Sequence, residues 1–355
     1  MTRIGILRLN ENPQFRDKIA CVVAASMGIE TFFFRPQDID FESRMIRGQH
    51  FLDDRWQTSF DEFPDVIYNH LPLTEAQKEI FTRLARDIPF TTHRIGNKNV
   101  VLKRLAQDGR FRENLIPMHR VRKGTDIFPL LERYGRIILK PANGKQGQRI
   151  YTIEPEGDDS FQFSHLLEKM NYTKGELIER IEEETKRNPM IVQPFIASQT
   201  IHGHSYCMRV HVAKGAGGKW KLVKFFPFVS NNNQESVSHL SHGAFSTTRM
   251  DIFMEQNYPD THQEVTRKIV EFARRFPVYF ESFYAYPLDA LGIDVGIGAD
   301  GNVYIYEVNS LPGTRYVEFQ AEYLAIQYCD HLARQNVSPA VNGLTAGWMK
   351  EQIEA

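Results

Sequence analysis

Cysteine, net charge and long apolar runs are all scarce in this 355-residue chain. Its three cysteines stand far apart, at Cys21, Cys207 and Cys329, which excludes a disulfide framework and a Cys-x-x-Cys zinc site. A formal net charge of −1 argues against nucleic acid or a membrane surface as the main partner. No uncharged run is long enough to span a bilayer, and the first residues lack the apolar region of a signal peptide. We therefore expect a cytoplasmic protein.

Two familiar catalytic signatures are missing as well. The chain has neither a Walker A loop nor a Gly-x-Ser-x-Gly motif, and no plausible Cys–His nucleophile is evident. Covalent catalysis by a side chain is therefore not expected. With 42% hydrophobic and 25% charged residues, the composition is that of a globular protein, and the length predicts two or three domains.

The most informative segment is a predicted β-hairpin at residues 291–313. The dipeptide Asp300-Gly301 suits a two-residue type I′ turn, and apolar residues flank it on both sides. With that turn Asp294 faces Glu307, and strand alternation places Asn309 on the same face as Glu307. Like charges opposite each other destabilise a sheet, so we expect a cation between them. Oxygen ligands suit Mg²⁺ or Mn²⁺ rather than zinc; the alternative is a solvent-facing hairpin with two chance acids.

A second group of residues is suited to phosphates. The apolar strand 136–140 ends at Lys140 and leads into a glycine-containing loop at 142–148, whose backbone N–H groups could cover a triphosphate. Lys98 begins a predicted helix at 96–108. An ordinary flexible hairpin and a solvated first-turn lysine are the alternatives.

Two further strands offer groups for a nucleotide. Residues 190–196 run into a proline bend and could present backbone groups to an adenine edge, with Phe195 and Ile196 lining the pocket. A plain core strand explains this segment equally well. Arg209 shares a strand face with His211 and could neutralise phosphate charge, or it could pair with a structural acid.

Alternating strands and helices predict a small α/β domain at residues 1–95. Its expected elements are strands at 3–8, 31–34 and 64–69, a polar hairpin around 43–57, and helices at 14–28 and 74–87, the last capped by Thr74. Beyond the helix at 96–108, the expected strands are 118–122, 136–140, 149–153, 190–195, 205–213 and 220–228. We also expect helices at 161–187, 260–276 and 316–335, with the acidic run 182–184 facing water.

Taken in order, the helix lysine, the strand lysine with its glycine loop, the hinge strand, the strand arginine and the Asp…Glu-x-Asn set resemble the ATP-grasp superfamily of carboxylate–amine ligases. The resemblance covers roughly residues 95–320. Ile4-Gly5-Ile6-Leu7, Ile67-Tyr68-Asn69 and Gly218-Lys219-Trp220 look most like the YheC/YheD group, which is associated with endospore coats.

This resemblance implies a mixed α+β and α/β chain. An ATP-grasp fold, in which two α+β subdomains clasp ATP, would follow the small N-terminal α/β domain. Central and lid subdomains are expected at 96–196, a C-terminal subdomain with the metal site at 197–335, and a tail at 336–355.

The resemblance also implies roles for individual residues. Lys98 and Lys140 would contact the phosphates, and Arg209 the γ-phosphate or an acyl-phosphate, so Lys140 and Arg209 are the predicted catalytic residues. The implied ligands of two Mg²⁺ ions are Asp294, Glu307 and Asn309. The remaining implied contacts are Asn143, Gly144, Gly147, Gln193, Pro194, Phe195, Ile196 and Gln199 for ATP, and Arg315, His242 and Gly243 for the substrate.

The implied activity is that of an ATP- and Mg²⁺-dependent carboxylate–amine ligase that forms ADP. It would join small-molecule or peptide carboxylates and amines into an amide or peptide bond through an acyl-phosphate. Two alternatives remain, namely a kinase on the same fold and a non-catalytic ATP-binding protein associated with the spore coat. A link to sporulation follows from the same resemblance.

Overall fold

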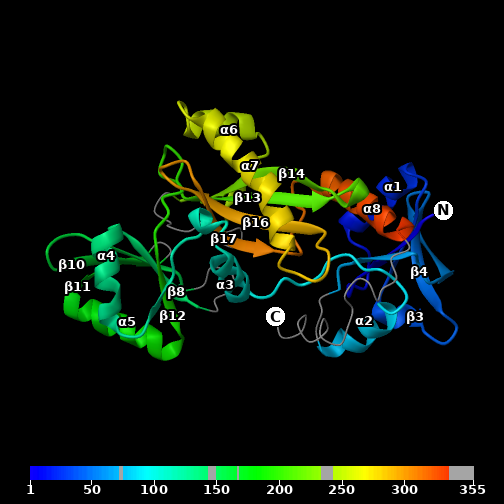
Figure 1. The fold of residues 1–355 in the computed structure, drawn as a ribbon, viewed down its shortest axis with the longest axis horizontal. Coiled ribbons are helices and arrows are strands. Elements are labelled where there is room, and N and C mark those ends of the chain that lie inside the picture. The colour runs from blue at the N-terminus through cyan, green and yellow to red at the C-terminus, as the bar shows by residue number, and fades with distance from the viewer. Residues whose placement is uncertain (72–74, 143–148, 166–167, 233–242, 336–355) are drawn as a thin grey trace.

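The chain folds around three β-sheets that follow one another along the long axis of the molecule (Figure 1). The computed structural model describes residues 1–71, 75–142, 149–165, 168–232 and 243–335. The N-terminal sheet lies on the right in Figure 1, the second sheet on the left, and the third between them. Among the described helices, none is both long enough and apolar enough to cross a membrane.

The N-terminal sheet has six strands, in the order β3-β4-β2-β1-β6, with β5 beside β4. The strands β2 and β6 lie parallel to β1, whereas β4 and β5 form an antiparallel hairpin. Its elements are β1 (Arg3–Leu7), α1 (Phe15–Ser26), β2 (Glu30–Phe34), η1 (Pro36–Asp38), β3 (Ile39–Asp40), β4 (Met45–Leu52), β5 (Arg55–Glu62), β6 (Val66–Asn69), η2 (Glu75–Gln77) and α2 (Lys78–Leu84). The predicted alternation is confirmed, although Thr74, the predicted cap, lies outside the described residues.

The second sheet also has six strands, in the order β11-β10-β9-β8-β12-β7. It follows α3 (Lys98–Asp108) and η3 (Arg112–Asn114). Its elements are β7 (His119–Val121), η4 (Gly124–Ile127), α4 (Phe128–Tyr134), β8 (Ile137–Pro141), β9 (Tyr151–Pro155), β10 (Ser160–His165), β11 (Glu168–Thr173), α5 (Lys174–Arg187) and β12 (Met190–Pro194).

The helix predicted at 161–187 is wrong in its first half, because β10 and β11 form an antiparallel hairpin there. Phe161 and Phe163 alternate with polar residues and bury their rings in the core of the sheet, which fits a strand rather than a helix. The helix α5 begins only after Thr173, whose hydroxyl oxygen accepts from the backbone N–H of Glu176 while the Glu176 carboxylate accepts from the Thr173 N–H.

The expectation that the whole acidic run 182–184 on α5 faces water is wrong. Glu184 is fully buried and forms ion pairs with Arg149, Arg180 and Arg187. Three guanidinium groups therefore hold one carboxylate between the helix and the sheet. The first two residues of the run are half-buried and exposed.

The third sheet is antiparallel, with the strand order β15-β14-β13-β16-β17. Its elements are β13 (Tyr206–Lys214), η5 (Ala216–Gly218), β14 (Trp220–Val229), β15 (Phe245–Ser246), α6 (Met250–Asn257), α7 (His262–Glu281), β16 (Ala290–Ile297) and β17 (Val303–Asn309), followed by α8 (Glu318–Arg334). The helix α7 packs on β13 and β14 through a stack of three rings, Phe272, Phe276 and Phe280, with centroids 5.0 and 5.2 Å apart.

The last helix, α8, lies against the N-terminal sheet and α1 as well as against β13 (Figure 1). The Glu322 carboxylate accepts from Arg16 of α1 at 2.6 Å and from the hydroxyl of Tyr68 at 2.8 Å. Its apolar side shares a core with residues such as Ile4 and Val23. A segment predicted to belong to the unit 197–335 therefore helps to build the N-terminal core, and the domain boundaries stay a prediction.

Candidate active site

The predicted metal patch lies toward the β17 edge of the third sheet. Asp294 on β16 is the register partner of Glu307 on β17, and Gly292 is that of Asn309. On the other side of β16, Asp294 pairs with Arg209 of β13. One row across three strands therefore carries Arg209, Asp294 and Glu307. The predicted facing pair is confirmed, whereas the metal-binding roles stay a prediction.

The two-residue turn from which this pairing was predicted is wrong. The hairpin closes through a three-residue loop, with bonds from Gly301 N–H to Gly298 C=O (2.9 Å) and from Gly298 N–H to Asn302 C=O (3.0 Å). Gly301 has a φ of 70°, the left-handed conformation that this loop requires and that glycine adopts readily. Such a loop shifts the register by one residue relative to the predicted two-residue turn.

A β-bulge further along the hairpin cancels this shift. Val295 pairs with Ile305, but the next pair is Asp294 with Glu307, so Tyr306 is an extra residue on β17. The burial pattern of β17 also skips a place, because Ile305 and the residue after Glu307 are buried while the two between are half-buried. The bulge thus brings Glu307 back opposite Asp294.

Arg209 and Asp294 form a two-pronged ion pair. The Arg209 Nε donates to one carboxylate oxygen at 2.5 Å and Nη2 to the other at 3.1 Å, and the side chains are only 15% and 17% exposed. Burial lowers the pKa of Arg209, but the charge of Asp294 outweighs it and leaves that pKa raised. Since the two oxygens of a carboxylate offer about four lone pairs, Asp294 could keep this pair and still bind a metal ion.

The two predicted phosphate lysines meet near Glu307. Burial and the nearby ammonium of Lys98 lower the pKa of Lys140 to about 7, while Glu307 acts in the opposite direction. Within the described part of the chain, neither lysine ammonium has an ion pair or a hydrogen bond of its own. Two neighbouring cations thus lack full compensation, which is the electrostatic condition for binding an anion.

Cys207 lies among these charges. Burial raises the pKa of its thiol well above the usual value, and the charges of Asp294, Arg209, Lys98 and Glu307 all act on it. The thiol therefore stays neutral and is unsuited to act as a nucleophile. The same electrostatic contacts show that residues separated by up to 209 positions in sequence gather at one place.

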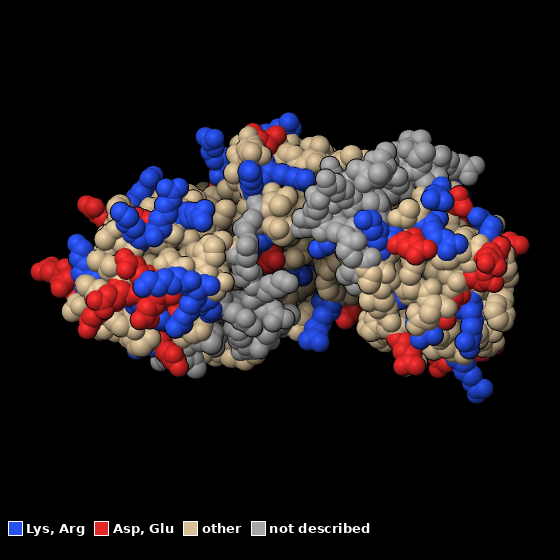
Figure 2. Space-filling model, turned by 90° about the horizontal axis from the view of Figure 1, so that it is seen from below, with Lys and Arg blue, Asp and Glu red and all other residues tan. Residues whose placement is uncertain are grey.

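The donor set of this patch fits a hard divalent cation next to a polyanion. Its oxygen donors are two carboxylates and the carboxamide of Asn309, without sulfur or nitrogen ligands. The face seen in Figure 2 is hollowed near the middle of the molecule, and acidic and basic side chains are visible there between the two lobes. The chain thus offers both halves of a metal–phosphate site.

The predicted adenine segment crosses from the second sheet to the third. Gln193 on β12 is buried and pairs with β8, and the Phe195 N–H donates to the C=O of Arg136 at 3.0 Å. The Arg136 guanidinium also lies 4.0 Å above the ring of Phe195. Pro194 ends β12, Ile196 is half-buried, and Gln199 forms a bridge to Ser205. Their contacts with a nucleotide stay a prediction.

The remaining predicted residues are more scattered. Asn143, Gly144, Gly147 and His242 lie outside the described residues. Gly243 has a φ of 83°, and its C=O accepts from the side-chain amide of Asn231. Arg315 is exposed on the segment that follows β17. The structure therefore brings together the lysines, Arg209 and the three oxygen donors, but it does not place Arg315 in that row.

A cavity adjoins the patch, and sequence reasoning missed most of its lining. It lies between the end of β6, the strands β13 and β16, and α8, and it is partly open to solvent. His70, His211 and Asp289 are among its walls. The one local signal was the position of His211, two residues after Arg209 on the same strand face; nothing in the sequence linked Asp289 to it.

A family model described as YheC/D like ATP-grasp matches residues 87–332, more than half of the chain and including all the oxygen donors of the patch. This chain belongs to the YheC/D like ATP-grasp family. Enzymes with the ATP-grasp fold use ATP and divalent metal ions, as the donor set of this member would suggest. Membership supports an ATP-dependent ligase in general terms.

Two Bacillus subtilis (strain 168) proteins resemble this YheC/D like chain. The endospore coat-associated protein YheD is 22% identical over 296 residues, which cover 79% of this chain but 64% of YheD, less than two thirds of its length. The endospore coat-associated protein YheC is 22% identical over 309 residues, covering 83% of this chain and 84% of YheC. The structure of D-cycloserine synthetase DcsG superposes with a TM-score of 0.50 at 15% identity, over 93% of this chain and 99% of that one, which shows a shared fold alone.

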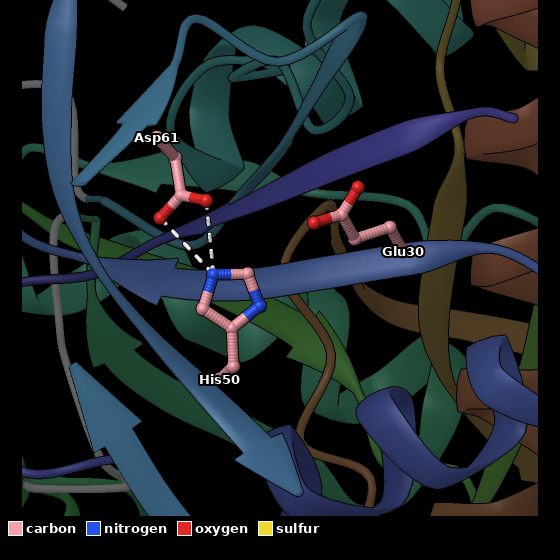
Figure 3. A group of neighbouring side chains, drawn as sticks. All are labelled: Glu30, His50 and Asp61. Atoms are coloured by element: carbon pink, nitrogen blue, oxygen red, sulfur yellow. Dashed lines mark hydrogen bonds and ion pairs between the residues drawn. The ribbon is translucent and has the colours of Figure 1, made fainter. Parts of the chain in front are cut away.

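One more polar cluster lies far from the ATP-grasp patch, on the N-terminal sheet (Figure 3). His50 Nε2 is 3.0 Å from both carboxylate oxygens of Asp61, and Glu30 lies beside them. Glu30 is already paired with Arg3 at 3.2 Å, and Asp61 also accepts from Ser59 at 2.9 Å. These acids thus have partners within the chain, and we assign no further role to them.

Proposed function

We propose that this chain is an ATP- and Mg²⁺-dependent carboxylate–amine ligase that forms ADP. The single observation that carries the proposal is the grouping of Lys98, Lys140 and Glu307 beside the Arg209–Asp294 pair. Lysines that have no counter-ion among the described residues suit phosphates, and acids facing each other across two strands suit a divalent cation. Family membership supports the ligase class, and the acyl-phosphate route is our inference.

In the proposed reaction, a carboxylate oxygen of one substrate attacks the γ-phosphorus of ATP, and the bond to ADP breaks. The amine nitrogen of the second substrate then attacks the acyl carbon. The C–N bond forms, phosphate leaves with the carboxylate oxygen, and the amine releases a proton. Asp294, Glu307 and Asn309 would hold Mg²⁺, which would supply charge neutralisation between the phosphates when bound. Lys98, Lys140 and Arg209 would position and neutralise the phosphoryl group.

The test is ADP formation with Mg²⁺ and a library of amino acids and small peptides, with the products identified by mass spectrometry. Glu307→Ala should abolish Mg²⁺-dependent ADP formation with any substrate that the wild type turns over. Glu255→Ala is the matched control, because Glu255 is an exposed residue of α6 far from the patch in sequence. It should leave the rate within twofold of the wild type.

Three results would contradict the proposal. A stable phosphorylated product in place of an amide would identify a kinase. Failure to bind ATP at millimolar Mg²⁺ would remove the catalytic role altogether. Equal loss of ADP formation in Glu307→Ala and Glu255→Ala would show that the patch has no special part in the reaction.

A further inference from the structure

The cavity beside the patch contains buried polar groups that no described residue satisfies. Within the part of the chain that the structure describes, neither ring nitrogen of His70 (8% exposed) has a hydrogen-bond partner, and Nδ1 of His211 (1% exposed) has none either. Buried polar atoms without partners are rare in folded proteins, because each costs free energy. Both imidazoles are in the walls of the cavity, so a ligand there could satisfy them.

Among the described charged side chains that line the cavity, one negative charge has no ion-pair partner. Arg16 pairs with Glu322, and Lys214 pairs with Glu281, so each cation of the wall has its own counter-charge. Asp289 is 9% exposed, and its carboxylate accepts a hydrogen bond from the Thr92 hydroxyl at 2.8 Å, with nearby backbone N–H groups also acting on it. Among the residues described, it is the charged group of this wall that has no ion-pair partner.

The two histidines do not restore this balance. Burial lowers the pKa of His211 to about 3 and that of His70 well below its ordinary value, so both rings are neutral near pH 7. A neutral imidazole keeps one nitrogen that accepts a hydrogen bond. An unpaired carboxylate and two accepting nitrogens together favour a ligand with several N–H donors and positive charge.

The wall of the cavity lies next to the predicted metal patch. His211 follows Arg209 by two residues on β13, which places it about 7 Å along the strand. Its register partner is Gly292, where a Cβ atom would stand 2.8 Å from Pro312 and 3.2 Å from Arg209 Nη1. The absence of a side chain at Gly292 thus lets the wall of the cavity meet the patch. Asp289 comes directly before β16, three residues or about 10 Å of extended chain from Gly292.

We propose that this cavity binds the amine substrate, and that this substrate is a diamino compound, a diamine or a diamino acid. Its distal ammonium group pairs with Asp289, its polar atoms contact His70 and His211, and its reacting amine lies at the His211 end, beside Arg209. This assignment rests on the proposed ligase function for its role in the reaction, but not for the binding itself.

The test measures binding to the full chain by calorimetry at pH 7 without nucleotide. The probes are unbranched diamines and diamino acids with three to six carbons between the nitrogens, against monoamines of equal length. Asp289→Asn removes the charge at nearly constant volume, and it should fold, because it replaces an unpaired buried carboxylate. Asp251→Asn, at an exposed aspartate, is the matched control.

We expect at least one diamino probe to bind the wild type and Asp251→Asn with Kd values within twofold of each other. Asp289→Asn should weaken it tenfold or more, and the monoamines should bind at least tenfold more weakly than the diamino probes. The proposal is overturned if Asp289→Asn binds as the wild type does, if monoamines bind equally well, or if no diamino probe binds. Asp289-dependent binding in a chain that fails to bind Mg·ATP would uphold the cavity site and defeat the ligase function instead.

Discussion

Lys140 should take up a proton when ATP binds. Its pKa of about 7 in the free chain reflects burial beside Lys98, and phosphate oxygens would return that pKa toward 10.5 by supplying the missing counter-charge. At pH 8 a group with a pKa near 7 is about one-tenth protonated, so binding should draw in about 0.9 proton per ATP. The same reasoning gives about 0.5 proton at pH 7 and about 0.1 at pH 6.

The assay is calorimetric titration with Mg·ATP in buffers of different ionisation enthalpy, because the slope of the observed heat against that enthalpy counts the protons. Lys140→Met removes the titrating group and should abolish the uptake. Lys219→Met, at an exposed lysine, is the control and should retain it. The difference between the chain and Lys140→Met also cancels the ionisation of the nucleotide itself. Uptake below about 0.2 proton at pH 8, or equal uptake in Lys140→Met, would refute the reasoning.

Lys140 also makes the free energy of unfolding depend on pH. Between pH 7 and 10.5 the unfolded chain binds the Lys140 proton and the folded chain does not, so this lysine makes folding more favourable as pH rises. Its penalty is fully present below pH 7 and amounts to at most about 5 kcal/mol at about 1.4 kcal/mol per pKa unit. Lys140→Met should therefore be more stable than the wild type in urea at pH 6, and this advantage should vanish at pH 10.5.

Three other predictions concern carboxylates. Glu307→Gln should change the free energy of unfolding by less than about 1 kcal/mol, because it removes both the repulsion from Asp294 and the attraction to Lys140. Thermal melting measures this change. A larger loss of stability would show that Glu307 is a structural residue. Asp294→Ala should destabilise the fold by about 3–5 kcal/mol in urea, since it leaves Arg209 buried without its partner, whereas Asp294→Asn, which keeps an acceptor, should lose clearly less. Glu184→Ala should lower the free energy of unfolding by a similar amount, because it leaves half-buried guanidinium groups without their carboxylate. Glu183→Ala, at an exposed neighbour, is the control. Equal losses of stability in both variants would show an effect on the helix and not on these ion pairs.

Local patterns in the sequence were sufficient for most elements of the fold. Period-2 alternation and turn residues mark the strands of the third sheet, and the spacing of Asp294, Glu307 and Asn309 along two strands placed the acids on one face. The hairpin at 160–173 is not predicted, because a strongly charged helix follows it directly. The predicted helix therefore begins too early, at Phe161.

Contacts between distant segments were beyond such patterns. The sequence around Arg209 fits either a phosphate contact or an ion pair with a structural acid. Only the sheet register shows that its acidic partner is Asp294. The cavity has walls from seven separate stretches of chain, so no local signal could join His70 to Asp289. Likewise, burial of Glu184 depends on Arg149, which lies on the far side of a hairpin.

The paired offsets of the metal hairpin have a consequence for insertions and deletions. The extra loop residue and the extra residue at Tyr306 each move β17 by one place, in opposite directions. Deletion of Tyr306 would remove the bulge and leave Glu307 opposite Asp294, because Val295 is already paired with Ile305. Deletion of one loop residue would leave the pairs beyond Gly298 and Asn302 in place and change only the type of turn. Loop and bulge can therefore vary independently, and a relative that lacks either one should still keep the two acids facing each other.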